Sequence, residues 1–517
     1  MKKVKYLTLF LFVFAASCSK IDNFLDEAPS RTSGLQITTI DHLEQLLNNF
    51  SLYAAEGNPT ALYSTDDFHI SKALYDARPA NFGINIIRYH NWDVSFLTEN
   101  GTNLTDGSFW AREFQKIFYA NTVLEYLDRV TGGTPEQKAN LKAEAHLIRA
   151  YSYWVLANTY CLPYTDATKN EPGLPIRLTI SFEEAAQRQP LYKVYEQIEA
   201  DLTDASKINV PLVQGGKITS WRANKAAVNG FAARYWLSRF NYEKALQYAN
   251  SALVEHSTLV DYKTEMSYSP ITATFTLRPS NTSYTVKYPI THDYRMTNNT
   301  LTDPTGILQW KEFMYLRMLS ESSWWYIPSS DLLALYDQTN DLRYRYHIVE
   351  GYSYDRGITN PSYDYPGYVF FFKSEVPSGP TVAEMLLIKA EALAHTGQSG
   401  PAMDALNTIR AKRMTAGSWV NLTAANNDDA MRKVTEERRR EMPFAQRWFD
   451  LRRYNHNEYA GDDVNLTRTF YPYTSAGVST TQPVQTYTLN KGSRRWAAPI
   501  PTTEIIASRG ELQQNTY

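Results

Sequence analysis

Two stretches of the sequence place flat aromatic side chains among polar and charged ones, outside the segments that look helical. The first is "ALYDARPANFGINIIRYHNWDVS", with Tyr75, Asp76, Arg78, Tyr89 and Trp92. The second is an aromatic region further along the chain, with Tyr284, Tyr288, Tyr294, Trp324 and Trp325. Aromatic faces suit the C–H groups of a pyranose ring, and neighbouring amides, carboxylates and guanidinium groups suit its hydroxyls. The pattern predicts a sugar-binding surface.

Each of these aromatic residues could instead pack in the core. Trp324 and Trp325 are adjacent and cannot both point the same way, so at most one of them faces a ligand. Trp92 and one member of that pair are the strongest candidates, with support from Tyr75, Arg78, Tyr89 and Tyr294. Four other tryptophans lie on apolar faces of predicted helices and are interpreted as packing residues: Trp110, Trp154, Trp221 and Trp236.

Motifs for catalysis are missing from the sequence. The nine histidines form no His-Glu-x-x-His zinc motif, and there is no Gly-x-Ser-x-Gly elbow, phosphate-binding loop or Cys-x-x-Cys pair. Two carboxylates could still meet in space as a glycosidase pair. We predict a protein that is not an enzyme, with no catalytic residue, no cofactor and no metal. The net charge of −2 argues against nucleic acid as a partner.

The N-terminus resembles an export signal. Three lysines (Lys2, Lys3 and Lys5) precede an apolar run from Tyr6 to Phe14 and the small residues Ala15-Ala16-Ser17. The run is shorter than the roughly 20 apolar residues that span a bilayer. Residues 1–17 are therefore predicted to be a signal peptide.

Cys18 follows that run directly. Ala-Ala-Ser-Cys resembles a bacterial lipobox, although Ala15 stands where leucine is usual, and it predicts lipidation of Cys18. An ordinary secretory peptide beside an unrelated cysteine is the alternative. Because Cys161 is the other cysteine of the chain, lipidation of Cys18 leaves no pair for an internal disulfide.

Helical periodicity dominates the rest of the chain, and the fold is predicted to be mainly α. Apolar residues recur at three- and four-residue steps in "SFWAREFQKIFYANTVLEYLDRV", "EQKANLKAEAHLIRAYSYWVLANTY", "RANKAAVNGFAARYWLSRF", "VAEMLLIKAEALAHTG" and "DAMRKVTEERRREMPFAQRWFDLRR". Residues from about 257 to 380 are instead rich in Tyr, Thr, Ser, Asn, Gly and Pro, which predicts long loops and a few short strands. We predict a single domain over 18–517 with this loop-rich insertion.

Small residues recur at the spacing of tetratricopeptide helix pairs. Ala233 is followed by Ala245 and Ala252, and Ala390 is followed by Gly397 and Ala402. Small side chains at these positions would let two antiparallel helices cross closely. The spacing predicts a scaffold of stacked helix pairs, with a generic alanine-containing bundle as the alternative.

The run Arg438-Arg439-Arg440 lies between Glu437 and Glu441. It could form a basic patch for an acidic partner. Charges of both signs at three- and four-residue spacing more often join a helix to its neighbours. We interpret this run as structural.

Five segments, taken in order, carry a family resemblance: "RAYSYWVLANTYCLPYTDATKNEPGLPI" (149–176), "WWYIPSSDLLALYDQTNDLRY" (324–344), "AEMLLIKAEALAHTG" (383–397), "ERRREMPFAQRWFDLRRY" (437–454) and "PIPTTEIIASRGELQQNTY" (499–517). Together they resemble the SusD/RagB family of Bacteroidetes outer-membrane lipoproteins. Met442-Pro443 and Ala445-Gln446 depart from the family's usual residues and are expected to change only local packing.

The resemblance implies a lipid-anchored protein on the outer face of the outer membrane. Such proteins lie as a lid over a SusC/RagA-like TonB-dependent transporter and hand it an oligosaccharide or, in some branches, a peptide. Tetratricopeptide-like helix pairs would pack against the transporter, and a loop-rich face, to which the two aromatic stretches contribute, would present the ligand. A protein that only docks other proteins is a third alternative.

Overall fold

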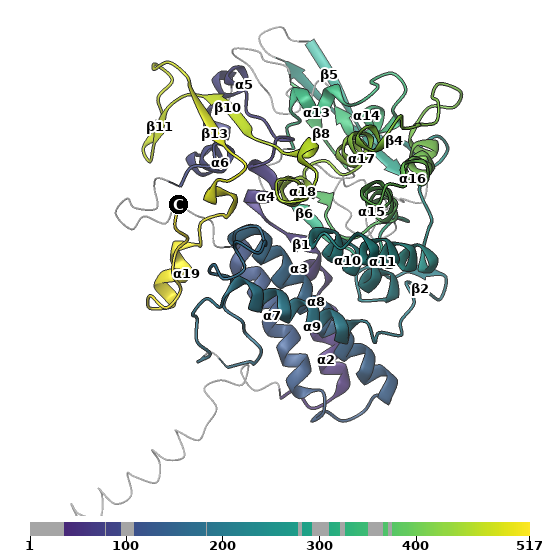
Figure 1. Cartoon of the computed structure of the whole chain (residues 1–517), viewed down its shortest axis with the longest axis vertical. Coiled ribbons are helices and arrows are strands. Elements are labelled where there is room, and N and C mark those ends of the chain that lie inside the picture. Colours follow the sequence, from purple (N-terminus) through teal and green to yellow (C-terminus); the bar gives the residue numbers. More distant parts are fainter. Residues whose placement is uncertain are drawn as a thin grey trace, which may run out of the picture.

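The computed structural model describes residues 36–77, 79–94, 108–181, 183–277, 282–291, 310–320, 326–349, 365–370 and 375–517. Within these ranges the chain is mainly helical, as predicted (Figure 1). The helices of the first half are α2 (Ile40–Leu47), α3 (Phe50–Ala54), α4 (Pro59–Tyr63), α5 (Lys72–Ala77), α6 (Ile84–His90), α7 (Ser108–Tyr126), α8 (Pro135–Tyr160) and α9 (Leu191–Ala205). Those of the second half are α10 (Lys225–Ser238), α11 (Tyr242–Glu255), α13 (Ser330–Ala334), α14 (Leu342–His347), α15 (Val382–His395), α16 (Ser399–Arg413), α17 (Asn427–Glu441), α18 (Arg447–Tyr454) and α19 (Thr502–Ala507).

The long helices pack as a stack of neighbours. Helix α8 contacts α7 and α9, α10 contacts α11, α11 contacts α15, and α15 contacts α16, while α17 covers α15 and α16 (Figure 1). Side chains of Thr134, Asn224, Asn241, Thr381 and Asn426 accept a backbone N–H at the start of α8, α10, α11, α15 and α17. This order agrees with the predicted scaffold of helix pairs.

The predicted small residues lie where the helices cross, with one exception. Ala233, Ala245 and Ala252 are fully buried between α10, α11 and α15, and Ala390 and Ala402 are fully buried between α15, α16 and α17. Gly397 does not pack at a crossing, because a Cβ there would meet nothing within 4 Å. Its φ of +77° instead allows the tight turn from α15 to α16.

The C-terminal arginine-rich segment forms two helices rather than the continuous helical pattern predicted. Helix α17 ends at Glu441 and α18 begins at Arg447. Pro443 lies between them, and a proline inside a helix removes one hydrogen bond and clashes with the preceding turn. Phe444 adopts a φ of +65°, which turns the chain into α18.

Most strands are two to five residues long: β1 (Ala55–Glu56), β2 (Val213–Gln214), β3 (Lys217–Ile218), β6 (Met318–Ser320), β7 (Ile348–Val349), β8 (Gly367–Tyr368), β9 (Glu375–Pro377), β10 (Leu466–Phe470), β11 (Tyr473–Thr474), β12 (Gly477–Val478) and β13 (Gln485–Leu489). The exception is an antiparallel hairpin of β4 (Met266–Leu277) and β5 (Thr282–Thr291). In a three-stranded sheet, β6 pairs parallel to β1 and antiparallel to β9. The short pairs β10–β13 and β11–β12 lie beside α5 and α6 at the upper left of Figure 1.

Helix α8 is buried over most of its length, with every residue from Ala143 to Tyr160 buried. Its buried charges are paired. Arg149 and His146 both contact the carboxylate of Asp201 on α9, and Glu144 accepts hydrogen bonds from Arg222. Trp154 lies in the core as predicted, as does Trp110 of α7, whereas Trp221 and Trp236 are half-buried against it.

Candidate ligand-binding site

Three residues of the predicted site lie in the described part of the chain: Tyr75, Tyr89 and Trp92. Arg78, Tyr294, Trp324 and Trp325 lie outside the described residues, as does Cys18. Tyr284 and Tyr288 belong to β5, where only the backbone is described. The site is therefore built here from the elements that hold Trp92 and from the segment that follows Trp325.

Trp92 is held in a strained and mostly buried position. It follows α6 with a φ of +55°, which is uncommon for any residue other than glycine, and its side chain is 5% exposed. The indole Nε1–H donates to the carbonyl of Ser64 at 2.8 Å. Such strain persists only where the surroundings fix the backbone, and it concentrates at functional positions.

Arg468 on β10 fixes those surroundings. Its guanidinium carbon lies 4.6 Å from the centre of the Trp92 ring. Its N–H groups donate to four backbone carbonyls, those of Tyr63, Thr65, Phe68 and His90. Burial lowers the pKa of Arg468 to about 9, so the side chain is still charged at neutral pH.

Three of these carbonyls, those of Tyr63, Thr65 and Phe68, belong to residues 63–70, which run from the end of α4 toward α5 and which we call the linking segment. The fourth, that of His90, lies at the end of α6. The other side of the linking segment pairs with residues 326–329. The His69 N–H donates to the Ile327 carbonyl at 3.2 Å, and the Ser329 N–H donates to the Asp67 carbonyl at 2.7 Å. Residues 326–329 follow the second predicted aromatic stretch directly in the sequence, so the linking segment contacts both the support of Trp92 and the chain next to that stretch.

Two helices of the arginine-rich segment clamp the linking segment. Arg439 of α17 donates to Asp67 at 2.6 Å, and Arg447 of α18 donates to both carboxylate oxygens of Asp66 at 2.8 Å. The Phe444 N–H also donates to Asp67 at 2.9 Å. Burial alone would raise the pKa of Asp66, but the charges of Arg447 and Arg439 outweigh it and lower that pKa.

The remaining arginines of the run also pair within the protein. Arg438 donates to Asp450 at 2.7 Å, and Arg440 donates to Glu437 at 2.9 Å. The structural interpretation of this run is confirmed.

Tyr75 packs in the core beneath the β10–β13 pair. Its ring meets Phe470 edge-to-face with centres 5.2 Å apart, and the side chain is 6% exposed. The neighbouring Asp76 accepts a hydrogen bond from the Tyr471 hydroxyl at 2.8 Å. Tyr75 thus supports the strand that carries Arg468.

Tyr89 is half-buried beside Trp92. The two residues line a space of about 30 Å³ together with Thr60, Trp448 and Arg495. Small-molecule pockets are usually at least about 300 Å³, so this space holds no sugar ring. A glycan at this site would lie on the surface above Tyr89 and not inside the protein.

Sequence reasoning missed Arg468 and the linking segment. The strand "LTRTF" alternates buried and exposed residues, and Arg468 occupies the buried face between Leu466 and Phe470. A charged residue on the apolar face of a short strand was the available signal, because a buried guanidinium needs several acceptors. Its acceptors lie about 400 positions away in the sequence, beyond the reach of local pattern.

Two wider hollows lie elsewhere, on either side of residues 184–190. Their volumes are about 520 and 730 Å³. Amide, charged and aliphatic groups line them without a tryptophan or tyrosine, so they lack the flat face that stacks on a sugar ring.

Neither a metal centre nor a membrane-spanning helix is found in the described ranges. No three His, Cys, Asp or Glu side chains there gather closely enough to hold an ion. None of the helices described has the length and apolar character needed to cross a bilayer.

Two family models match the sequence. One, described as "Starch-binding associating with outer membrane", matches residues 23–237, and the other, described as "SusD family", matches residues 382–517. Together they cover more than half of the chain. The protein belongs to the SusD/RagB family.

Solved structures of SusD-like proteins share this fold. A SusD superfamily protein from Bacteroides thetaiotaomicron is 18% identical, with a TM-score of 0.60 over 93% of this chain and 100% of its own. A SusD-like protein from Bacteroides fragilis is 17% identical, with a TM-score of 0.62 over 95% and 99%. Surface glycan-binding protein A from Bacteroides uniformis is 18% identical, with a TM-score of 0.58 over 92% and 99%. No curated protein matches the sequence.

Proposed function

We propose that this SusD/RagB protein binds an oligosaccharide or polysaccharide at the cell surface, without catalysis, and delivers it to a SusC/RagA-like TonB-dependent transporter. The observation that carries the proposal is the linking segment. Through Arg468 and the 327–329 pairing, it ties the support of Trp92 to the chain that follows Trp324 and Trp325. We infer from this connection that the two aromatic stretches, separated by more than 200 residues, contribute to one face. Glycan binding by a SusD-like protein of the same fold, the surface glycan-binding protein A, supports this ligand class.

Membrane attachment is the second part of the proposal. Cys18 would be lipidated after removal of residues 1–17, and the lipid would hold the protein on the outer face of the outer membrane. Radiolabelled palmitate should appear in the wild-type protein expressed in a Bacteroidetes host and be absent from Cys18→Ser. Equal labelling of both proteins would remove the anchor from the proposal.

A binding screen tests the ligand class. Protein that begins after Cys18 is run on native gels cast with different polysaccharides, alongside the Trp324→Ala/Trp325→Ala double variant. Retardation by one glycan, lost in the double variant, is the expected result. Trp419→Ala is the matched control, because Trp419 lies in the loop between α16 and α17 and should leave retardation unchanged.

Oligopeptides are titrated in parallel. A clear response to peptides together with no retardation by any glycan would overturn the glycan proposal and favour peptide cargo. Co-purification with the transporter in the absence of either response would indicate a docking protein.

A further inference from the structure

The strand pair β10–β13 carries a tyrosine next to the arginine that supports Trp92. In the register of this pair, Tyr487 of β13 lies opposite Arg468 of β10. Opposite residues of an antiparallel pair project from the same face of the sheet. Because the Arg468 guanidinium lies over the Trp92 ring, Tyr487 belongs to the face of the strand pair that is turned toward Trp92.

Along β13, this face emerges from the core. Leu489 is buried, Tyr487 is half-buried and Gln485 is exposed. The Tyr487 hydroxyl donates to the Tyr471 carbonyl at 3.0 Å, and the Gln485 amide donates to the same hydroxyl. These two hydrogen bonds fix the orientation of the Tyr487 ring. Part of a flat aromatic side chain is therefore held in place at the surface.

Tyr473 of β11 enlarges this aromatic surface. Its ring stacks on that of Tyr487, with ring centres 5.6 Å apart and planes inclined by 22°. Both side chains are half-buried and pack against the hydrophobic core that also contains Trp92. The two residues, which we call the tyrosine pair, lie beside α6 at the upper left of Figure 1. Together they offer a wider flat face than one ring alone.

A carboxylate lies beside both rings. Burial and the nearby charge of Asp93 raise the pKa of Tyr473 and of Tyr487, so both hydroxyls remain protonated at neutral pH. Asp93 follows Trp92 directly and is half-buried. An aromatic face with a carboxylate at its edge suits a pyranose ring, whose C–H groups meet the aromatic ring while its hydroxyls donate to the carboxylate.

The tyrosine pair is continuous with the surface around Tyr89. Asp93 and Tyr89 line the same small space, together with Arg495. The Arg495 guanidinium donates to the Trp92 carbonyl at 3.3 Å and to the Thr488 carbonyl of β13 at 2.6 Å. Arg495 thus joins the turn after α6 to the strand that carries one member of the pair. A sugar ring on the pair would lie next to Tyr89.

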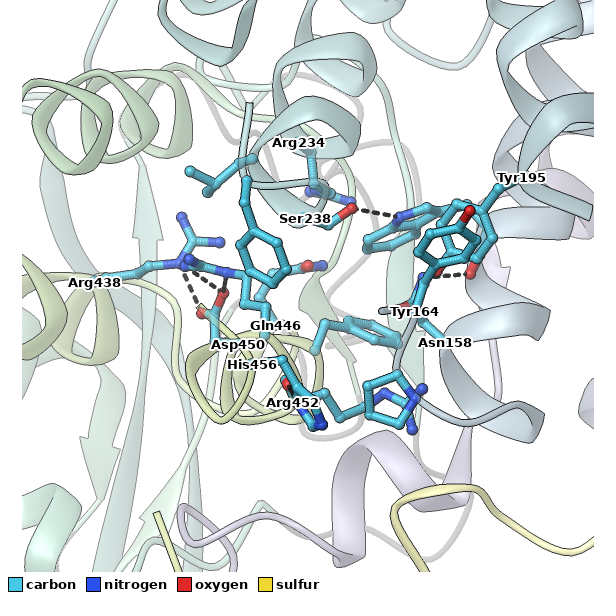
Figure 2. A pocket seen from close by; sticks show the side chains of 16 residues that line it. Asn158, Tyr164, Tyr195, Arg234, Ser238, Arg438, Gln446, Asp450, Arg452 and His456 are labelled. Carbon is cyan, nitrogen blue, oxygen red and sulfur yellow. Dashed lines mark hydrogen bonds and ion pairs between the residues drawn. The ribbon is translucent and has the colours of Figure 1, made fainter. Parts of the chain in front are cut away.

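A second aromatic cluster is closed in by its neighbours. Tyr164 and Tyr195 lie at a space of about 30 Å³ between α8, α9, α10, α17 and α18 (Figure 2). Their ring centres are 4.6 Å apart, and the guanidinium carbon of Arg239 lies 3.7 Å from the centre of the Tyr164 ring. A space of this size holds no sugar ring. We therefore assign the cluster in Figure 2 to packing.

We propose that the tyrosine pair is a subsite on which one pyranose ring of the glycan stacks, while Asp93 accepts a hydrogen bond from a hydroxyl group of that ring. This inference rests on the glycan-binding function proposed above and adds a contact surface to it. On this side of the molecule, direct contact with the ligand passes from Trp92, which is 5% exposed, to Tyr473 and Tyr487.

Calorimetric titration tests the subsite in solution. The probes are maltohexaose, cellohexaose, laminarihexaose and mannohexaose, titrated into protein that begins after Cys18. Tyr487→Leu keeps apolar packing but removes the flat ring, and it should weaken binding of the hexasaccharide that the wild type binds by about two- to tenfold. Tyr487→Phe should retain most of the affinity, because stacking needs the ring and not the hydroxyl. Tyr192→Leu, a half-buried tyrosine of α9, is the matched control and should bind like the wild type.

The outcomes separate this subsite from the proposed function. Wild-type affinity in folded Tyr487→Leu and Tyr473→Leu, together with lost affinity in Trp324→Ala/Trp325→Ala, would overturn the subsite and leave glycan binding intact. A response to oligopeptides with no response to any sugar would overturn both.

A crystal structure of the wild-type protein soaked with the bound hexasaccharide requires no variant to fold. We expect a pyranose ring within about 4 Å of the Tyr473 or Tyr487 ring, and one sugar hydroxyl within hydrogen-bond distance of Asp93. Sugar density that contacts only other residues would overturn the subsite.

Discussion

The helix stack and the loops around Trp92, on the proposed ligand side, are held together in different ways. Between α10, α11, α15 and α16, fully buried alanines bring helices into close contact. Around Trp92, by contrast, irregular backbone is fastened by arginines: Arg468 binds four carbonyls, while Arg439 and Arg447 hold Asp66 and Asp67. Loops cannot satisfy their own backbone groups as helices do. A precise loop face therefore needs long side chains with several donors, and arginine supplies them.

Loss of Arg468 should have the largest effect. Arg468→Met leaves buried carbonyls without donors and should lower the free energy of unfolding by about 3 kcal/mol or more. Glycan binding should also fall, because the linking segment loses the hydrogen bonds that Arg468 donates to its carbonyls. Urea unfolding and native-gel retardation measure the two effects. A variant as stable as the wild type would show that water replaces the guanidinium without cost.

Overpacking the stack should affect stability alone. Ala249→Leu inserts three carbons on the fully buried face of α11 that packs against α10 and α15 and should cost about 1–3 kcal/mol. Gln247→Leu, exposed on the same helix, serves as the control and should cost little. Both variants should keep glycan retardation at the wild-type level wherever they remain folded. Loss of retardation in a folded Ala249→Leu protein would show that the two regions are coupled.

Acid should weaken the clamp on the linking segment. The pKa of Asp66 is lowered in the folded protein, below the value of about 3.9 for an unfolded chain. Its stabilising contribution is thus present above about pH 5 and is lost as the pH falls through 3.9 toward the folded pKa. Asp66→Asn should be less stable than the wild type by about 1–2 kcal/mol at pH 7, with a smaller gap at pH 2.5. A gap that is the same at both pH values would contradict this assignment.

An exposed arginine of α17 should matter least. Arg432 pairs with Asp429 and Glu436 on the surface of the helix, each at 2.7 Å. Arg432→Ala should change the free energy of unfolding by no more than about 0.5 kcal/mol, because water screens such pairs. Arg439→Ala breaks the buried contact with Asp67 and should lower the free energy of unfolding by more. Urea unfolding of the two variants compares an exposed ion pair with a buried one.

The sequence was sufficient for the helices because their signals are local. Apolar spacing predicted α7, α8, α10 and α15, and the small residues predicted the close crossings of α10 with α11 and of α15 with α16. The break at Pro443 was not predicted, although a proline inside a helical pattern is a signal for one. The role of Gly397 in a turn also required its backbone conformation.

The proposed ligand side was less predictable from the sequence. Trp92 was singled out for its chemistry, yet its burial and its contact with Arg468 depend on residues almost 400 positions apart. The linking segment carries no aromatic repeat or motif that marks it. Its role follows from backbone hydrogen bonds to residues 327–329 and from two aspartates whose partners lie near the C-terminus.

The most direct test of the central claim is calorimetric titration with an oligosaccharide of the glycan identified on gels. Wild-type protein, Trp324→Ala/Trp325→Ala and Arg468→Lys are compared, each first shown to be folded by its cooperative unfolding. We expect the double variant to lose at least tenfold in affinity, and Arg468→Lys, which keeps the charge but not the fork of donors, to lose affinity as well. Unchanged affinity in both folded variants would contradict a glycan site on the face that the linking segment holds together.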